Sequence, residues 1–120
     1  AELSNTPLPS AGQIIGRLEE LERDLASRQT DAEQLAGGYA RAKRDYEEAY
    51  ARAFTEAGGN GKLSIEARKM LALLKLVQDG DYKTLVVAEA AWEGCKAGLR
   101  VLETRASLGQ SVLRAMVRHE

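Results

Sequence analysis

The spacing of apolar residues constrains this fold most, because they recur at alternating intervals of four and three along most of the 120 residues. This spacing places apolar side chains on one side of an α-helix and is typical of helices that pack in pairs or bundles. In the first half these positions, here called the first seam, are Ile14, Leu18, Leu21, Leu25, Arg28, Ala32, Leu35, Tyr39, Ala42, Tyr46, Ala49 and Ala53. The register predicts one helix over about 10–57, although Gly37-Gly38 leaves a local kink as an alternative.

The same spacing returns in the second half and predicts a second helix over about 64–118. Its positions, here called the second seam, are Ala67, Leu71, Leu74, Gln78, Asp81, Leu85, Ala88, Trp92, Cys95, Leu99, Leu102, Ala106, Gly109, Leu113 and Met116. The segment QDGDY at 78–82 favours a turn, so the alternative is a break into three helices. The unchanged register on both sides of this segment favours a continuous helix.

Short motifs mark where the predicted helices begin and end. Ser10 and Gln13 have the spacing of a capping box, in which the two residues satisfy each other's backbone N–H groups at a helix start. Residues 1–9 contain both prolines and are predicted to form an extended leader. The cluster GGNGKLS at 58–64 predicts the turn between the helices, with Ser64 as the N-cap of the second.

These elements predict an all-α fold, a long antiparallel two-helix hairpin forming a single domain over 10–120. A turn centred on Asn60-Gly61 places residues opposite each other when their numbers add to about 121. The first 60 residues carry 7 basic and 11 acidic side chains, and the remainder carry 10 and 7. In this register Arg41, Lys43 and Arg44 lie opposite Asp79 and Asp81, and Glu19, Glu20, Glu22 and Asp24 lie opposite Lys96, Arg100 and Arg105.

A second apolar stripe lies beside the second seam and predicts self-association of the hairpin into an oligomeric helical bundle, because so broad an apolar face is rarely left in water. The residues predicted to form the contact are Met70, Leu73, Val77, Val87, Ala91, Gly94, Gly98, Val101, Leu108 and Val112. The two glycines among them would let another helix approach closely. The alternative is a three-helix fold that covers its own stripe.

The composition argues against an enzyme and against a metal or cofactor site. The chain has one His and one Cys, too few for the usual hydrolase and metal-binding sets. Cys95 falls in the second seam and is predicted to be a small packed side chain. Asp79 and Asp81 are predicted to be ion-pair partners, because no further ligands follow at the spacing of a calcium loop.

The nearly balanced charge, with 17 basic and 18 acidic side chains, does not favour nucleic acid as a partner. One local set could still stack on and clamp a single strand: Tyr39, Arg41, Lys43, Arg44, Tyr46 and Tyr50. No run of about 18 uncharged apolar residues occurs, so no membrane span is predicted. A single free Cys fits a reducing compartment, and the cytoplasm is the expected location.

Three stretches resemble small α-helical, coiled-coil hairpin accessory proteins encoded by tailed bacteriophages and prophages: YARAKRDYEEAYARAF at 39–54, EARK at 66–69 and CKAGLRVLETRASLGQSVLRA at 95–115. The resemblance implies a viral accessory protein that acts by contact with another protein in the bacterial host cytoplasm, in phage DNA metabolism or host takeover. The resemblance implies no catalytic residue in this chain. The alternatives are a structural component of the virion and a single-stranded nucleic-acid-binding helical protein.

Overall fold

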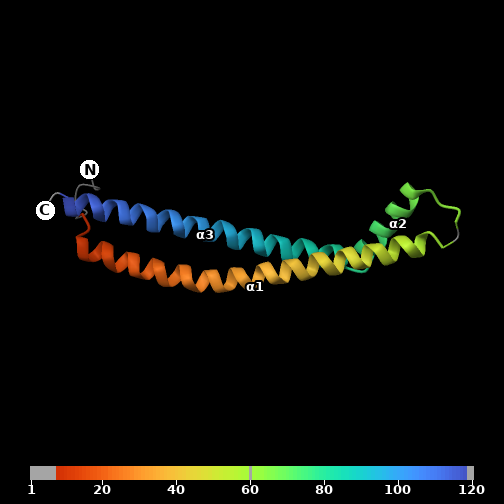
Figure 1. The fold of residues 1–120 in the computed structure, drawn as a ribbon, viewed down its shortest axis with the longest axis horizontal. Helices are drawn as coiled ribbons and strands as arrows, with labels where there is room; N and C mark the ends of the chain where they lie inside the picture. Colours follow the sequence, from red (N-terminus) through yellow and green to blue (C-terminus); the bar gives the residue numbers. More distant parts are fainter. Residues whose placement is uncertain (1–7, 60, 119–120) are drawn as a thin grey trace. The chain divides into compact units, whose positions relative to one another are not determined.

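The computed structural model describes residues 8–59 and 61–118, which form three α-helices and contain no β-strand. They are α1 (Ala11–Ala57), α2 (Ile65–Gln78) and α3 (Asp81–Arg118) (Figure 1). The predicted all-α class is therefore confirmed. Residues 1–7 of the predicted leader lie outside the described residues, and 8–10 have no regular secondary structure. No helix in the described part of the chain is long and apolar enough to cross a membrane.

The two predicted helix starts are confirmed by hydrogen bonds. The Ser10 N–H donates to Gln13 Oε1 at 2.8 Å, and the Gln13 N–H donates to Ser10 Oγ at 3.2 Å, so both partners of the capping box are in place. The Ser64 hydroxyl accepts from the Ala67 N–H at 3.2 Å and caps α2. Helix α1 runs through Gly37-Gly38 without a break, as its seam predicts.

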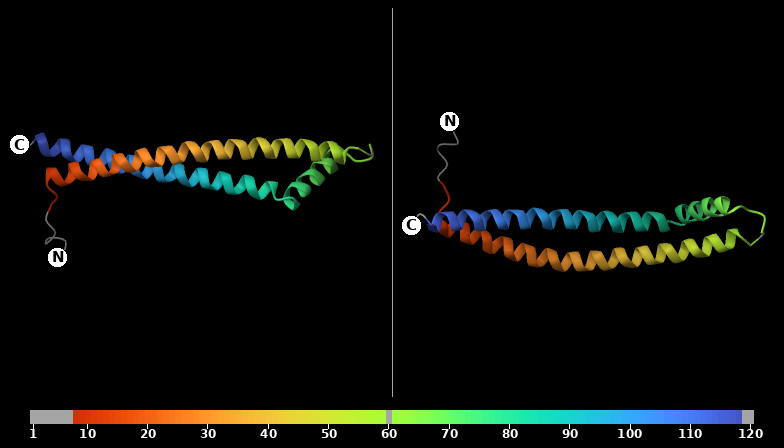
Figure 2. Two further views of the ribbon diagram at one scale, coloured as in Figure 1. Left: turned by 90° about the horizontal axis from the view of Figure 1, so that it is seen from below. Right: turned by 45° about the horizontal axis from the view of Figure 1, so that its top comes forward.

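The prediction of one continuous helix over 64–118 is wrong, because the chain breaks between Gln78 and Asp81. Gly80 has a φ of +85°, a left-handed conformation that L side chains rarely adopt and that commonly ends a helix. Its N–H donates to the Val77 carbonyl at 3.3 Å. The left view of Figure 2 shows the chain changing direction between α2 and α3.

The break changes which face of α2 is packed. The first seam is buried or half-buried along α1 except at Arg28, and the second seam is buried or half-buried along α3 from Asp81 to Met116. In α2, however, the seam residues Leu71 and Leu74 are exposed, and Ala72 and Leu76 are buried instead. The predicted seam is therefore wrong within α2.

Two compact units divide the described chain. In one, the α1 residues up to 31 pack against the α3 residues from 96 onward. A Cβ added at Gly109 would lie 2.8 Å from Leu18 Cδ2, and one added at Gly98 would lie 3.2 Å from Arg28 Nη1. Residue numbers rise along α1 as they fall along α3, so the two segments are antiparallel. The predicted register is displaced, because it places Leu18 opposite residue 103, six positions before Gly109.

The other unit comprises residues 32–95 and contains the largest buried side chain described, Leu76. Leu76 and Ala72 of α2 pack with Ala53 of α1. The half-buried side chains packed around this core are Tyr46, Ala49, Tyr50 and Phe54. α2 is thus held against the last turns of α1 by a small hydrophobic cluster.

Candidate interaction surface

Arg68 fixes the beginning of α2 to the end of α1. Its Nε and Nη2 atoms donate to the Phe54 carbonyl at 3.4 and 3.2 Å, and its guanidinium lies 4.0 Å from the centre of the Phe54 ring. The last carbonyls of a helix carry partial negative charge, so a cation is favourable there even though the Phe54 carbonyl also accepts from the Gly58 N–H at 3.2 Å. A Cβ at Gly58 would overlap the guanidinium in its present position, so a side chain there would require Arg68 to move.

Lys75 forms the second polar connection between α2 and α1. Its Nζ donates to Glu56 Oε2 at 2.8 Å. This hydrogen bond and the positive charge of Lys75 lower the pKa of Glu56, and the same contacts raise the pKa of Lys75. The pair therefore stabilises the fold above the ordinary glutamate pKa, and this stabilisation is lost as the pH falls through the lowered pKa. It is also lost in strong base, as the pH rises through the raised pKa of Lys75.

Replacing Lys75 by Met should raise the pKa of Glu56 toward its ordinary value, because both the hydrogen bond and the charge are removed. Carboxyl ¹³C NMR titration of the two proteins measures this change. The control is Lys69→Met, since Lys69 pairs with Glu66 at 3.6 Å and should leave the pKa of Glu56 unaltered. An unchanged Glu56 pKa in Lys75→Met would contradict the assignment of the pair.

The side of α2 that points away from α1 is apolar, here called the outer face of α2 (Met70, Leu73, Leu74 and Val77). Met70 and Leu74 each lie two positions from the buried Ala72, about 200° around the helix axis. The side chains are 71% exposed at Met70, 52% at Leu74 and 57% at Val77. The segment MLALLKLV at 70–77 contains one charged residue, so its sequence is apolar on nearly all sides of the helix. This apolar run could have indicated an outer apolar face from the sequence. The four–three register did not show it, because it assigned Leu71 and Leu74 to the packed side of the helix.

The structure leaves most of the predicted self-association residues uncovered. The exposed ones are Met70, Leu73, Val77, Val87, Ala91, Gly94, Val101, Leu108 and Val112. Gly98 differs, because it is half-buried and Arg28 of α1 lies close to it. The close approach expected at Gly98 is therefore made by an arginine of the same chain.

The residues suggested for nucleic-acid contact do not share one side of α1. Tyr46 lies against Tyr82 with ring centres 6.4 Å apart, and Tyr50 stacks on Phe54 at 6.3 Å. Burial, and then the nearby Tyr82 and Tyr50, raise the pKa of Tyr46. The basic residues Arg41, Lys43 and Arg44 are exposed, whereas Tyr39, Tyr46 and Tyr50 are half-buried. Arg44 lies two positions from Tyr46, about 200° around the helix.

The ion pairs predicted between the basic residues at 41–44 and the aspartates of the QDGDY segment are not formed. No nitrogen of Arg41, Lys43 or Arg44 lies within 4 Å of the carboxylates of Asp79 or Asp81, whereas Glu56 pairs with Lys75. The displaced register accounts for this, because a shift of several residues separates charges that a sum of 121 would bring together. Cys95 is half-buried and free, consistent with its seam position, and His119 lies outside the described residues.

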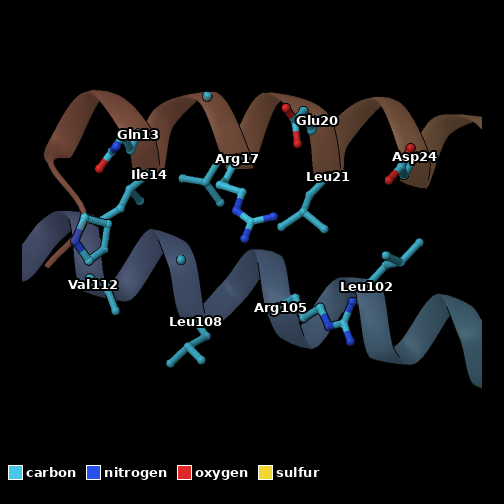
Figure 3. Close-up of a pocket in the computed structure, with 14 residues that line it drawn as sticks. Gln13, Ile14, Arg17, Glu20, Leu21, Asp24, Leu102, Arg105, Leu108 and Val112 are labelled. Atoms are coloured by element: carbon cyan, nitrogen blue, oxygen red, sulfur yellow. The ribbon is translucent and has the colours of Figure 1, made fainter. Parts of the chain in front are cut away.

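A groove of about 980 Å³ lies between the first part of α1 and the last part of α3, which belong to the same unit. Its apolar lining includes Ile14, Leu18, Leu21, Leu102, Leu108 and Val112. Figure 3 shows the guanidinium group of Arg17 in the space between the two helices and that of Arg105 against the α3 ribbon. The two arginines are balanced by Glu20 and Asp24 in the same lining, so the groove has no excess charge to select a ligand.

Within the described residues, no three His, Cys, Asp or Glu side chains come together as metal ligands would. Comparisons of the chain with protein-family models, with curated proteins and with solved structures find no match. What the described surface offers to a partner is the set of exposed apolar side chains on α2 and α3.

Proposed function

We propose that this chain is a self-associating helical interaction protein, a phage-type accessory protein that binds another protein in phage DNA metabolism or host takeover. The observation that carries this proposal is the number of large apolar side chains left exposed on α2 and α3, Met70, Val77 and Leu108 among them. Exposed apolar patches of this extent mark interaction sites in soluble proteins. An antiparallel hairpin packed into a bundle would cover them.

Sedimentation equilibrium of the purified full chain tests the proposal. We expect a species at a multiple of 13.1 kDa that dissociates on dilution, because an interface built from exposed side chains on stable helices obeys mass action. A 13.1 kDa species at every concentration up to about 1 mM, where associations of only ~4 kcal/mol are already half-formed, would overturn self-association.

A second candidate is a structural component of the virion, favoured by the uninterrupted 47 residues of α1. A helix of that length spans about 70 Å and could serve as a strut. Mass spectrometry of purified virions separates the two functions, because an accessory protein acting in the host cytoplasm would be absent from them. Binding to single-stranded nucleic acid is not proposed, since the tyrosines that would stack on bases are half-buried.

A further inference from the structure

The way α2 is turned toward α1 is the reverse of what is usual for an amphipathic helix on a protein surface. The side toward α1 holds Ala72 and Leu76 together with two cationic residues, Arg68 and Lys75, whose charged groups bind the end of α1. From Met70 to Val77 the outer face of α2 holds only apolar side chains, and Glu66, one turn before Met70 on the same side, pairs with Lys69 at 3.6 Å. A surface helix normally turns its apolar stripe inward and its charges outward. The contacts that Arg68 and Lys75 make with α1 therefore hold the more apolar side of α2 in solvent.

We infer that the outer face of α2 is an interface with the outer face of α2 in a second copy of this chain, with the two helices antiparallel. The inference rests on the proposed self-association and assigns it to a particular site. It adds Leu74, a second-seam residue expected to pack within the chain, to the interface. The contact would be isologous, each copy presenting the same residues.

The spacing of the outer face suits pairing with itself. A two-fold axis between Leu73 and Leu74 places Leu73 of each copy against Leu74 of the other, and Met70 against Val77. Every outer-face side chain then meets an apolar partner, and no like charges are opposed. The same 3–4 spacing allows side chains of two helices to interlock along a contact of two turns.

The charges that border the outer face favour a second copy over a charged partner. Lys75 is held by Glu56 at 2.8 Å, and Glu66 pairs with Lys69 at 3.6 Å, both within the chain. A partner that depended on charge would have to compete for these groups. The outer face of α2 is therefore suited to an apolar helix whose neighbouring charges are already paired. Each copy of the chain carries such a helix, its own α2.

Sedimentation equilibrium of Leu74→Glu and Val117→Glu locates the interface. Both residues are exposed, 52% and 59%, so both variants should fold, as circular dichroism would verify. Leu74→Glu should raise the dimer Kd about 100-fold or more, because each copy would bury an unpaired carboxylate. Val117→Glu, on α3 and outside the predicted self-association residues, should change it less than about threefold. Dimers of Leu74→Glu as stable as the wild type would overturn the α2 interface and leave self-association standing.

Disulfide trapping tests the antiparallel arrangement independently of the charge variants. In a Cys95→Ala background, the double variant Met70→Cys/Val77→Cys should oxidise to a covalent dimer, because residues 70 and 77 of different copies face each other. The matched control, Ala90→Cys/Ala97→Cys at exposed positions of α3 with the same spacing, should remain mostly monomeric on a denaturing gel. Efficient trapping by the control alone would overturn the inference. A monomeric wild type would overturn the inference together with the self-association on which it rests.

Discussion

Replacing Leu76 by Ala should lower the free energy of unfolding by about 3 kcal/mol, within the range of about 2–5 kcal/mol measured for buried leucines. Leu76 is 1% exposed and packs against Ala53 and Ala72 in the cluster that joins α2 to α1. Its truncation removes apolar burial and leaves a cavity that the small neighbouring alanines cannot fill. Urea unfolding followed by circular dichroism, with variant and wild type at one protein concentration, measures the change.

The same substitution at Leu63 provides the control for Leu76→Ala. Leu63 lies in the turn before α2 and is 41% exposed, so Leu63→Ala should cost less than about 1 kcal/mol. Equal losses of stability in the two variants would show that Leu76 is not the centre of a packed cluster. The comparison also tests the face of α2, because the predicted seam would have placed Leu71 and Leu74 inside instead.

Gly80→Ala should destabilise the protein by about 1 kcal/mol. Alanine at a φ of +85° costs about 1–2 kcal/mol relative to glycine, and the reduced freedom of the unfolded chain offsets only part of that cost. The break between α2 and α3 depends on this conformation, so the strain falls where the chain changes direction. Thermal and urea unfolding both report the loss.

Gly37→Ala should have the opposite effect on stability and raise the free energy of unfolding by about 0.5–1 kcal/mol. Gly37 lies inside α1, and nothing is within 4 Å of the position that its Cβ would take. Alanine there improves helix propensity without a clash. If Gly80→Ala were as stabilising as Gly37→Ala, the helix would run through residue 80, as the unbroken heptad register predicts.

Helix starts and the packed sides of α1 and α3 could be predicted from the sequence because they depend on neighbours a few positions away. The Ser10–Gln13 capping box and the Ser64 cap each join residues three positions apart. The four–three spacing is likewise a property of one helix, and it correctly identifies the packed side of the long helices. The break at Gly80 was visible as an alternative, although the register on both sides favoured the wrong choice.

The sequence located most of the exposed apolar surface, and self-association through that surface stays a prediction. Nine of the ten stripe residues are exposed, but Gly98 lies beside Arg28, and Leu74 belongs to the exposed surface instead of the seam. Arg68 and Lys75 were not identified as anchors, because their partners Phe54 and Glu56 are 14 and 19 positions away. Contacts over such distances depend on the turn at 58–64 and on the register, which periodicity does not define.

The sequence by itself determined that the chain is helical, where its helices are capped and which side of α1 and α3 is packed, since all of these follow from spacing along one helix. Only the tertiary structure decided how α2 is turned and which residues of α1 and α3 meet. Because Gly80 adopts a left-handed conformation, α2 does not continue the register of α3. Arg68 and Lys75 bind the end of α1 and so determine which side of α2 is packed. Those contacts join distant segments, and they leave the outer face of α2 exposed.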